Sequence, residues 1–118
     1  MFYILNESRM AGVSGAIDFY WSLETLTNYV EAIDVLNQEF RAYDSLGNVI
    51  SLAATSEFGP IKATTESSQS GKEELASVLR SFLQWAASEG RFGVGKDQVL
   101  LATELHQLVE LVPSSLIS

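Results

Sequence analysis

The sequence predicts a mixed α+β fold: an antiparallel sheet of about five strands with the helices packed on one face, in the order ββαβββαα. Hydrophobic residues make up 47% and charged residues 19% of the 118 residues, as in ordinary globular domains. Short segments with alternating apolar residues are separated by turn residues from longer segments with helical spacing. No linker divides the chain, so residues 1–118 are expected to form a single domain.

Two apolar segments near the N-terminus predict a β-hairpin. Phe2–Asn6 and residues 16–21 are strand-like, and residues 11–15 supply the small residues of a turn. Alternation in the second segment predicts one face toward the core and places Tyr20 on the other face, away from it.

A helix of about five turns is predicted next, over residues 23–40. Ser22 is a suitable N-cap because its side-chain oxygen can accept from a backbone N–H of the first turn. The apolar residues that recur at steps of three and four are Leu23, Leu26, Val30, Ile33, Leu36 and Phe40.

Three strand-like segments then predict a meander: Phe40–Asp44, residues 49–54 and residues 61–66. Residues 45–48 fit a type I turn with Gly47 in the left-handed conformation. The polarity of the third segment predicts a strand at the edge of the sheet.

Two further helices are predicted in the C-terminal part of the chain. The first starts with Ser70 as N-cap and Glu73 three residues on, and it ends near Gly90. The second starts after Asp97, and residues 113–118 are expected to form a loose tail. The apolar stripes of all the helices and strands predict a core that includes Trp21, Leu26, Val30, Ile33, Leu79, Phe82, Leu105 and Leu108.

Composition excludes several classes of function. The chain has no cysteine, so it has no disulfide, thiolate metal ligand or cysteine nucleophile, which fits a reducing compartment. The apolar stretch Phe2–Leu5 is too short for a signal peptide, so a cytoplasmic location is expected. A net charge of −8 repels phosphate backbones and anionic lipid, which makes nucleic acid and membranes poor partners. No apolar run reaches the roughly 18 residues of a membrane-spanning helix.

Three candidate chemical motifs are weak. Residues 90–96 satisfy G-x-x-x-x-G-K, but Asp97 replaces the Ser or Thr that binds magnesium, so a turn between helices is the better interpretation. His106, the only histidine, is expected at the rim of a helix with Glu110 as partner. Glu73 and its neighbour Glu74 fit the first turn of a helix better than an acid–base pair. No catalytic residue, cofactor or metal site is assigned.

The most unusual feature is the placement of charge. Residues 18–44 hold six acidic residues and one basic residue. On a helical wheel Glu24, Glu31 and Asp34 fall within about 80° of one another, with Val35 near the edge of the group. These residues, together with Tyr20, form the candidate binding surface, because a basic partner would relieve the repulsion between the carboxylates. A solvated face is the alternative explanation.

No motif in the chain identifies a family, so the functional hypotheses rest on charge and on missing catalytic groups. The first is a non-enzymatic acidic protein-binding module, an inhibitor or immunity-type protein that masks a basic partner protein. The second is a small-molecule-binding or carboxylate-based enzyme domain with a pocket between sheet and helices. The third is an accessory subunit or homo-oligomer that uses an exposed strand edge or apolar patch.

Overall fold

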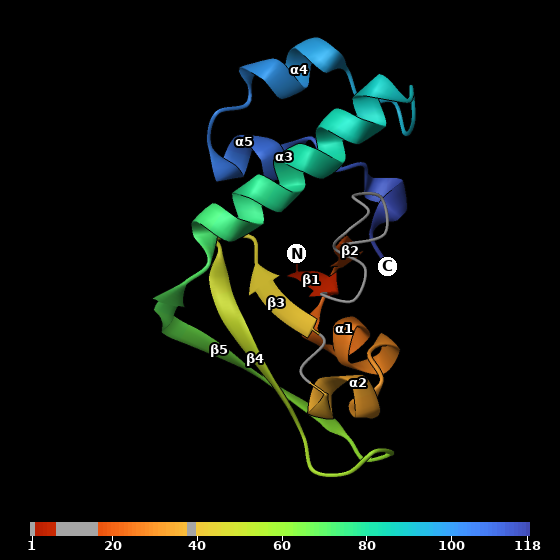
Figure 1. Ribbon diagram of the computed structural model, residues 1–118, viewed down its shortest axis with the longest axis vertical. Helices are drawn as coiled ribbons and strands as arrows, with labels where there is room; N and C mark the ends of the chain where they lie inside the picture. The colour runs from red at the N-terminus through yellow and green to blue at the C-terminus, as the bar shows by residue number, and fades with distance from the viewer. Residues whose placement is uncertain (1, 7–16, 38–39) are drawn as a thin grey trace.

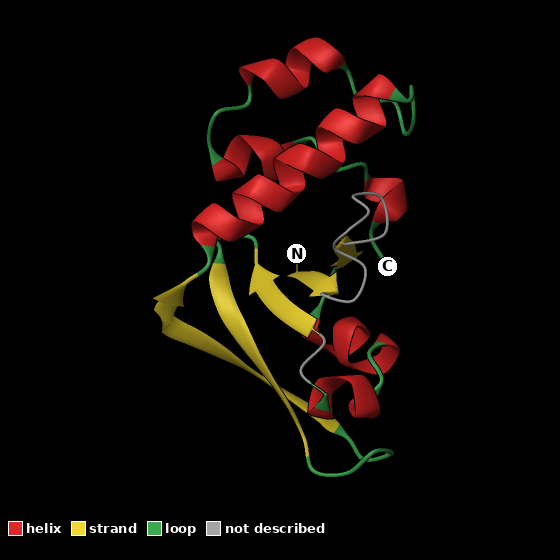
Figure 2. Ribbon diagram, in the orientation of Figure 1, coloured by secondary structure: helices red, strands yellow, loops and turns green. Residues whose placement is uncertain are grey.

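The computed structural model confirms the mixed α+β class (Figures 1 and 2). It describes residues 2–6, 17–37 and 40–118, and it places only the backbone of residues 2, 4–6, 34, 40 and 66–69. The turn predicted at residues 11–15 lies outside the described residues. The strands are β1 (Phe2–Asn6), β2 (Ile17–Tyr20), β3 (Phe40–Asp44), β4 (Asn48–Ala54) and β5 (Ile61–Ser70). The helices are α1 (Leu23–Tyr29), α2 (Ala32–Leu36), α3 (Lys72–Ser88), α4 (Lys96–Leu101) and α5 (Leu105–Glu110).

Strands β3, β4 and β5 form the predicted antiparallel meander, and β5 lies at the edge of the sheet. Gly47, in the turn between β3 and β4, has the predicted positive φ of 84°. Strand β1 pairs with β2 on one side and β3 on the other, which gives the strand order β2-β1-β3-β4-β5. The order of elements along the chain differs from ββαβββαα because two of the predicted helices are each divided in two.

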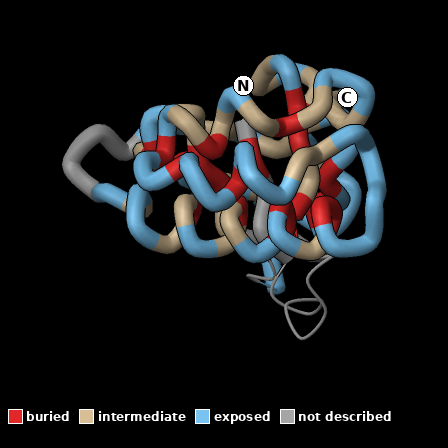
Figure 3. The backbone as a smooth tube through the Cα atoms, turned by 90° about the horizontal axis from the view of Figure 1, so that it is seen from above, coloured by how far each residue is buried: buried red, intermediate tan, exposed pale blue. Residues whose placement is uncertain are grey.

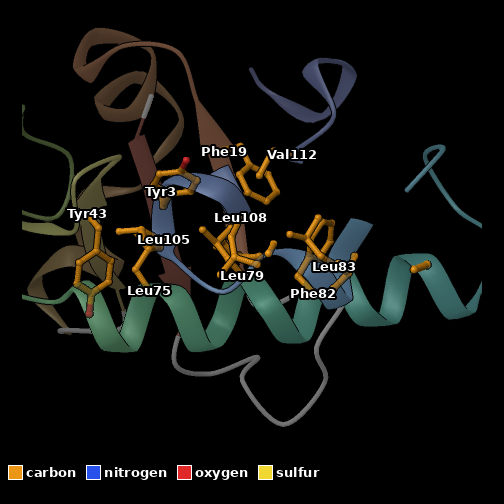
Figure 4. Packing of buried hydrophobic residues seen from close by; sticks show 14 residues of the cluster. Tyr3, Phe19, Tyr43, Leu75, Leu79, Phe82, Leu83, Leu105, Leu108 and Val112 are labelled. Atoms are coloured by element: carbon orange, nitrogen blue, oxygen red, sulfur yellow. The ribbon is translucent and has the colours of Figure 1, made fainter. Parts of the chain in front are cut away.

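The prediction that all helices pack on one face of the sheet is wrong. Successive strand residues point to opposite faces, and on these strands both faces contribute buried apolar residues. Phe19 and Tyr43 belong to the larger buried cluster, under α3, α4 and α5 (Figure 4). Their neighbours Tyr20 and Ala42 belong to a smaller cluster, with Leu26 of α1 and residues of α2. Helices α1 and α2 therefore cover one face of the sheet, and α3 with α5 covers the other (Figure 1).

The single helix predicted over residues 23–40 is also wrong. Ser22 is the N-cap of α1, as predicted, and its hydroxyl accepts from the backbone N–H of Thr25 at 3.1 Å. However, Val30 and Glu31 have extended conformations, with ψ angles of 133° and 135°, and they separate α1 from α2. Thr27, Asn28 and Tyr29, which precede the break, are all weak helix formers.

This break changes which apolar residues are buried. Val30 and Val35, five residues apart, both reach the smaller cluster, whereas Ile33 is 38% exposed. Trp21, also predicted in the core, is 57% exposed because the chain bends just after β2 ends at Tyr20. The other predicted core residues are buried: Leu26, Val30, Leu79, Phe82, Leu105 and Leu108. The buried positions lie toward the inside of the molecule (Figure 3).

Helix α3 begins and ends close to the predicted positions. Its N-cap is Gly71 instead of Ser70, because β5 continues to Ser70 and is longer than the predicted segment 61–66. A side chain at position 71 would overlap the ring of Tyr43, so glycine is required where α3 crosses β3. Gly90, just beyond the end of α3, has a φ of 64°.

The last predicted helix is divided into α4 and α5, and α4 starts after Gly95 instead of Asp97. The side chain of Gln107 accepts from the backbone N–H groups of Thr103 and Glu104, at 2.8 and 3.0 Å. These bonds satisfy backbone donors at the start of α5, so a new helix begins there.

The prediction of a loose tail at residues 113–118 is wrong. The segment contains a 3-10 turn at Ser114–Leu116, after which Ile117 forms a parallel bridge with Phe19. The backbone N–H of Ser118 donates to the carbonyl oxygen of Phe19, and the N–H of Trp21 donates to that of Ser118, both at 3.0 Å. The tail is ordered because it uses backbone groups of β2 that face away from β1.

Candidate functional site

The structure distributes the predicted acidic surface over two helices. Glu24 is exposed in the first turn of α1, and Glu31 is exposed at the break before α2. Asp34 lies in α2, but its side chain is outside the described part of the structure. The continuous helical stripe expected from the wheel does not form, because the chain leaves the helix between Tyr29 and Ala32.

Val35 and Tyr20, the other two predicted binding residues, are not on the surface. Val35 is buried in the smaller cluster. Tyr20 does point away from the larger cluster, but α1 covers that face, and its side chain is only 8% exposed. Its ring centroid lies 6.1 Å from that of Tyr29 in α1. Both residues therefore hold α1 and α2 on the sheet and are unable to contact a partner directly.

A cleft of about 580 Å³ opens beside Glu31, between the α1–α2 break and the loop that joins β4 to β5. We call it the tip cleft, because the loop lies at one end of the long axis of the molecule (Figure 1). Its charged lining residues, Glu31 and Glu57, are both acidic. Ile33 and Phe58 also line it, and Phe58 is 95% exposed. The tip cleft thus combines negative charge with exposed apolar side chains.

Sequence reasoning missed Glu57 and Phe58. In the sequence, Phe58-Gly59-Pro60 indicates a break between strands, and an aromatic residue in such a turn is also a signal for a binding surface. The backbone N–H of Gly59 donates to the carbonyl oxygen of Ser56 at 3.3 Å, which closes a tight turn around Glu57 and Phe58. The turn holds the Phe58 ring out in solvent.

A second polar group lies where α3 meets β3. The Glu74 carboxylate accepts a hydrogen bond from the Arg41 guanidinium at 2.9 Å and another from the Tyr43 hydroxyl. Residues more than 30 positions apart form this cluster, so spacing within one helix gave no signal for it. It ties the first turn of α3 to the sheet. Its carboxylate is engaged by two donors, while the neighbouring Glu73 is exposed, and the arrangement suits a structural connection better than acid–base chemistry.

The structure gives the remaining sequence candidates, residues 90–96 and His106, no arrangement that suits a nucleotide or catalytic site. Residues 90–96 connect two helices, and a phosphate-binding loop must instead follow a strand. His106 is exposed, and its Nδ1 atom lies 3.3 Å from a carboxylate oxygen of Glu104 instead of pairing with the predicted Glu110. Within residues 2–6, 17–37 and 40–118, no group of three or more His, Asp or Glu side chains is arranged to hold a metal ion.

Tyr3 is the titratable residue most affected by the fold. Its side chain is fully buried in the larger cluster. Burial raises the pKa of Tyr3 to about 12. The phenol therefore stays protonated at neutral pH and contributes to packing.

The chain matches no protein-family model, no curated protein and no solved structure. None of the helices in the described part of the chain is long and apolar enough to cross a membrane. The function therefore has to be inferred from the surface of this molecule, on which the tip cleft is the strongest candidate site.

Proposed function

We propose that this protein is a non-enzymatic binding module, an inhibitor or immunity-type protein that masks a basic surface on a partner protein and docks through the tip cleft. The single observation that carries this proposal is the composition of the cleft. Its charged lining residues are two glutamates, and an almost fully exposed phenylalanine stands beside them.

The carboxylates supply the attraction. Glu31 and Glu57 come from different elements but line one hollow, and the exposed Glu24 lies on the adjoining helix α1. Carboxylates that repel one another gain from a partner that brings Lys or Arg side chains, and the gain appears mainly as faster association. Because the net charge of the chain is −8, its long-range field favours the same class of partner.

Phe58 supplies the anchor. Binding energy at protein interfaces concentrates in a few large side chains that fill a pocket on the partner, surrounded by polar residues. Phe58 fits this role because its ring is in solvent while its backbone is held in the Ser56–Gly59 turn. Less conformational freedom is then lost on binding than from a freely moving loop.

Self-association through the same surface is a weaker candidate. A two-fold symmetric contact places the same patch on both subunits, so Glu31 and Glu57 would approach the carboxylates of the same patch on the second copy. Like charges at an interface disfavour binding, whereas a basic partner removes the repulsion.

The test is affinity capture from a lysate of the source cells with the parent chain and two charge-matched variants as baits. Glu31→Lys with Glu57→Lys changes the tip cleft. Glu89→Lys with Glu110→Lys makes the same change in net charge at exposed positions on α5 and just beyond the end of α3. We expect the parent and the control variant to retain a basic protein that the tip variant loses. If both variants retain it equally, or if no basic protein distinguishes them, the proposal is wrong.

A further inference from the structure

A second hollow, of about 500 Å³, lies where the C-terminal half of α3 passes β2, and it shares no lining residue with the tip cleft. We call it the aromatic cleft. Its wall is formed by Phe82 and Trp85 of α3 and by Phe92 of the turn after that helix. Its charged lining residues are Arg91 and Asp18. The volume lies within the range of small-molecule sites.

The three rings form one aromatic surface that runs from a buried ring to an exposed ring. The ring centroid of Phe82 lies 6.0 Å from that of Trp85 and 6.4 Å from that of Phe92, and the Phe82 and Phe92 planes differ by only 22°. Phe82 is buried, and Figure 4 shows it within the larger cluster, whereas Phe92 is 44% exposed. The cleft therefore has a fixed floor and an accessible rim, both aromatic.

Arg91 supplies a positive charge at this surface. The centre of its guanidinium lies 5.3 Å from the centroid of the Trp85 ring, so the aromatic face orients the side chain. Among the described residues no carboxylate forms an ion pair with Arg91. In a chain with fifteen acidic residues, an exposed arginine that pairs with an indole leaves its N–H donors available for an external anion.

Backbone strain places Phe92 at the rim. Its φ of 59° lies in the left-handed region, which bulky side chains rarely adopt, and Gly90 and Gly93 on either side also have positive φ. Strained residues of this kind gather at ligand-binding sites, where the strain holds a side chain in its working position. Here the strain holds a partly exposed ring beside Arg91.

From these features we infer that the aromatic cleft binds a small planar aromatic carboxylate. The ring of the ligand packs against Trp85 and Phe92, and its carboxylate accepts a pair of hydrogen bonds from Arg91. An aromatic cation is disfavoured by Arg91. This site is separate from the proposed protein-binding surface, and neither depends on the other.

The experiment is a nuclear magnetic resonance titration of the ¹⁵N-labelled chain with 2-naphthoate. The two tryptophans give two indole N–H signals, and Trp21 serves as an internal control because it does not line the cleft. We expect the Trp85 signal to shift saturably while the Trp21 signal stays in place. Neutral 2-naphthamide and non-aromatic cyclohexanecarboxylate should each bind at least about tenfold more weakly, the loss expected when a charge-assisted hydrogen bond or an aromatic contact is removed.

Variants separate specific binding from adsorption to an apolar surface. Arg91→Gln should weaken 2-naphthoate binding at least about tenfold, whereas Lys96→Gln, the same charge change at an exposed position on α4, should leave it unchanged. The amide spectrum of each variant verifies that it is folded. Equal shifts of both indole signals, equal binding of the neutral amide, or unchanged binding by a folded Arg91→Gln chain would each overturn the inference. The variant with Glu31→Lys and Glu57→Lys should bind 2-naphthoate as the parent does, so failure of one proposal is distinguishable from failure of the other.

Discussion

The ring of Phe92 lies nearly parallel to that of Phe82, 22° apart in plane, although the backbone of Phe92 is in the left-handed region. The two residues make unequal contributions to stability. Phe82 is buried in the larger cluster and stabilises the fold. Phe92 gains a ring contact with Phe82, but its backbone conformation is unfavourable, so the two effects partly cancel.

Replacing the two phenylalanines should therefore give very different results. Phe82→Ala should lower the free energy of unfolding by about 3 to 5 kcal/mol, as for other buried aromatic residues. In Phe92→Gly the loss of a partly exposed ring is offset by relief of left-handed strain of about 1 to 2 kcal/mol, so the change should stay under about 1 kcal/mol. Urea denaturation measures both. A large loss of free energy of unfolding in Phe92→Gly would show that this ring is needed for folding. It would also contradict the claim that backbone strain at Phe92 offsets the ring contact.

The meeting of α3 with β3 gives a second prediction, because Gly71 and Gly95 are both N-cap residues with different surroundings. A Cβ at position 71 would overlap the Tyr43 ring, whereas one at position 95 would come within 3.1 Å only of the flexible Gln98 side chain. Gly71→Ala should destabilise the protein by about 1 to 3 kcal/mol more than Gly95→Ala, since the cost of alanine at an N-cap is common to both. Equal midpoints in urea would contradict the close packing of Tyr43 on Gly71.

The elements that sequence analysis located well are those with local causes. The turn between β3 and β4 follows from Gly47, and the strands on either side follow from their own alternation. The break between α1 and α2 has a partly tertiary cause. Weak helix formers permit it, but burial of Val30 and Val35 in one cluster determines where the chain turns. Helical periodicity alone could not show this, because the same residues also fit a continuous apolar stripe.

The candidate sites were harder to predict for the same reason. Glu31 was identified from its charge, but its neighbours in the tip cleft, Glu57 and Phe58, come from a loop more than 25 positions away. Tyr20 was misplaced because alternation shows that two faces differ and does not show that a second helical layer covers the other face. The aromatic cleft had an unrecognised signal: residues 90–96 contain Arg91 and Phe92 between glycines, in a segment that was interpreted as a turn alone.

Tyr3 predicts a dependence of stability on pH. Its pKa is raised from 10 to about 12 in the folded protein, so the unfolded chain loses the proton first as the pH rises. The contribution of Tyr3 is therefore complete below pH 10 and is lost as the pH rises toward 12. The parent chain should lose about 1 kcal/mol more free energy of unfolding than Tyr3→Phe between pH 9 and pH 11. Parallel loss in both chains, measured by urea denaturation at the two pH values, would show that the Tyr3 phenol ionises freely.

The last prediction concerns how fast the partner obtained by affinity capture associates. If Glu24, Glu31 and Glu57 attract a basic surface, changing all three to Lys should slow association at least about tenfold at low salt. The difference should shrink as the screening length falls toward about 3 Å at 1 M salt.

Phe58→Ser should act differently, because the removed ring contributes after contact is made. It should mainly raise the dissociation rate and leave the salt dependence of association unchanged. Surface plasmon resonance over a salt series measures both rates, with the variant carrying Glu89→Lys and Glu110→Lys as the control for net charge. Association of the triple variant at the parental rate at every salt concentration would show that these carboxylates are only a solvated face, and the interface would then have to lie elsewhere.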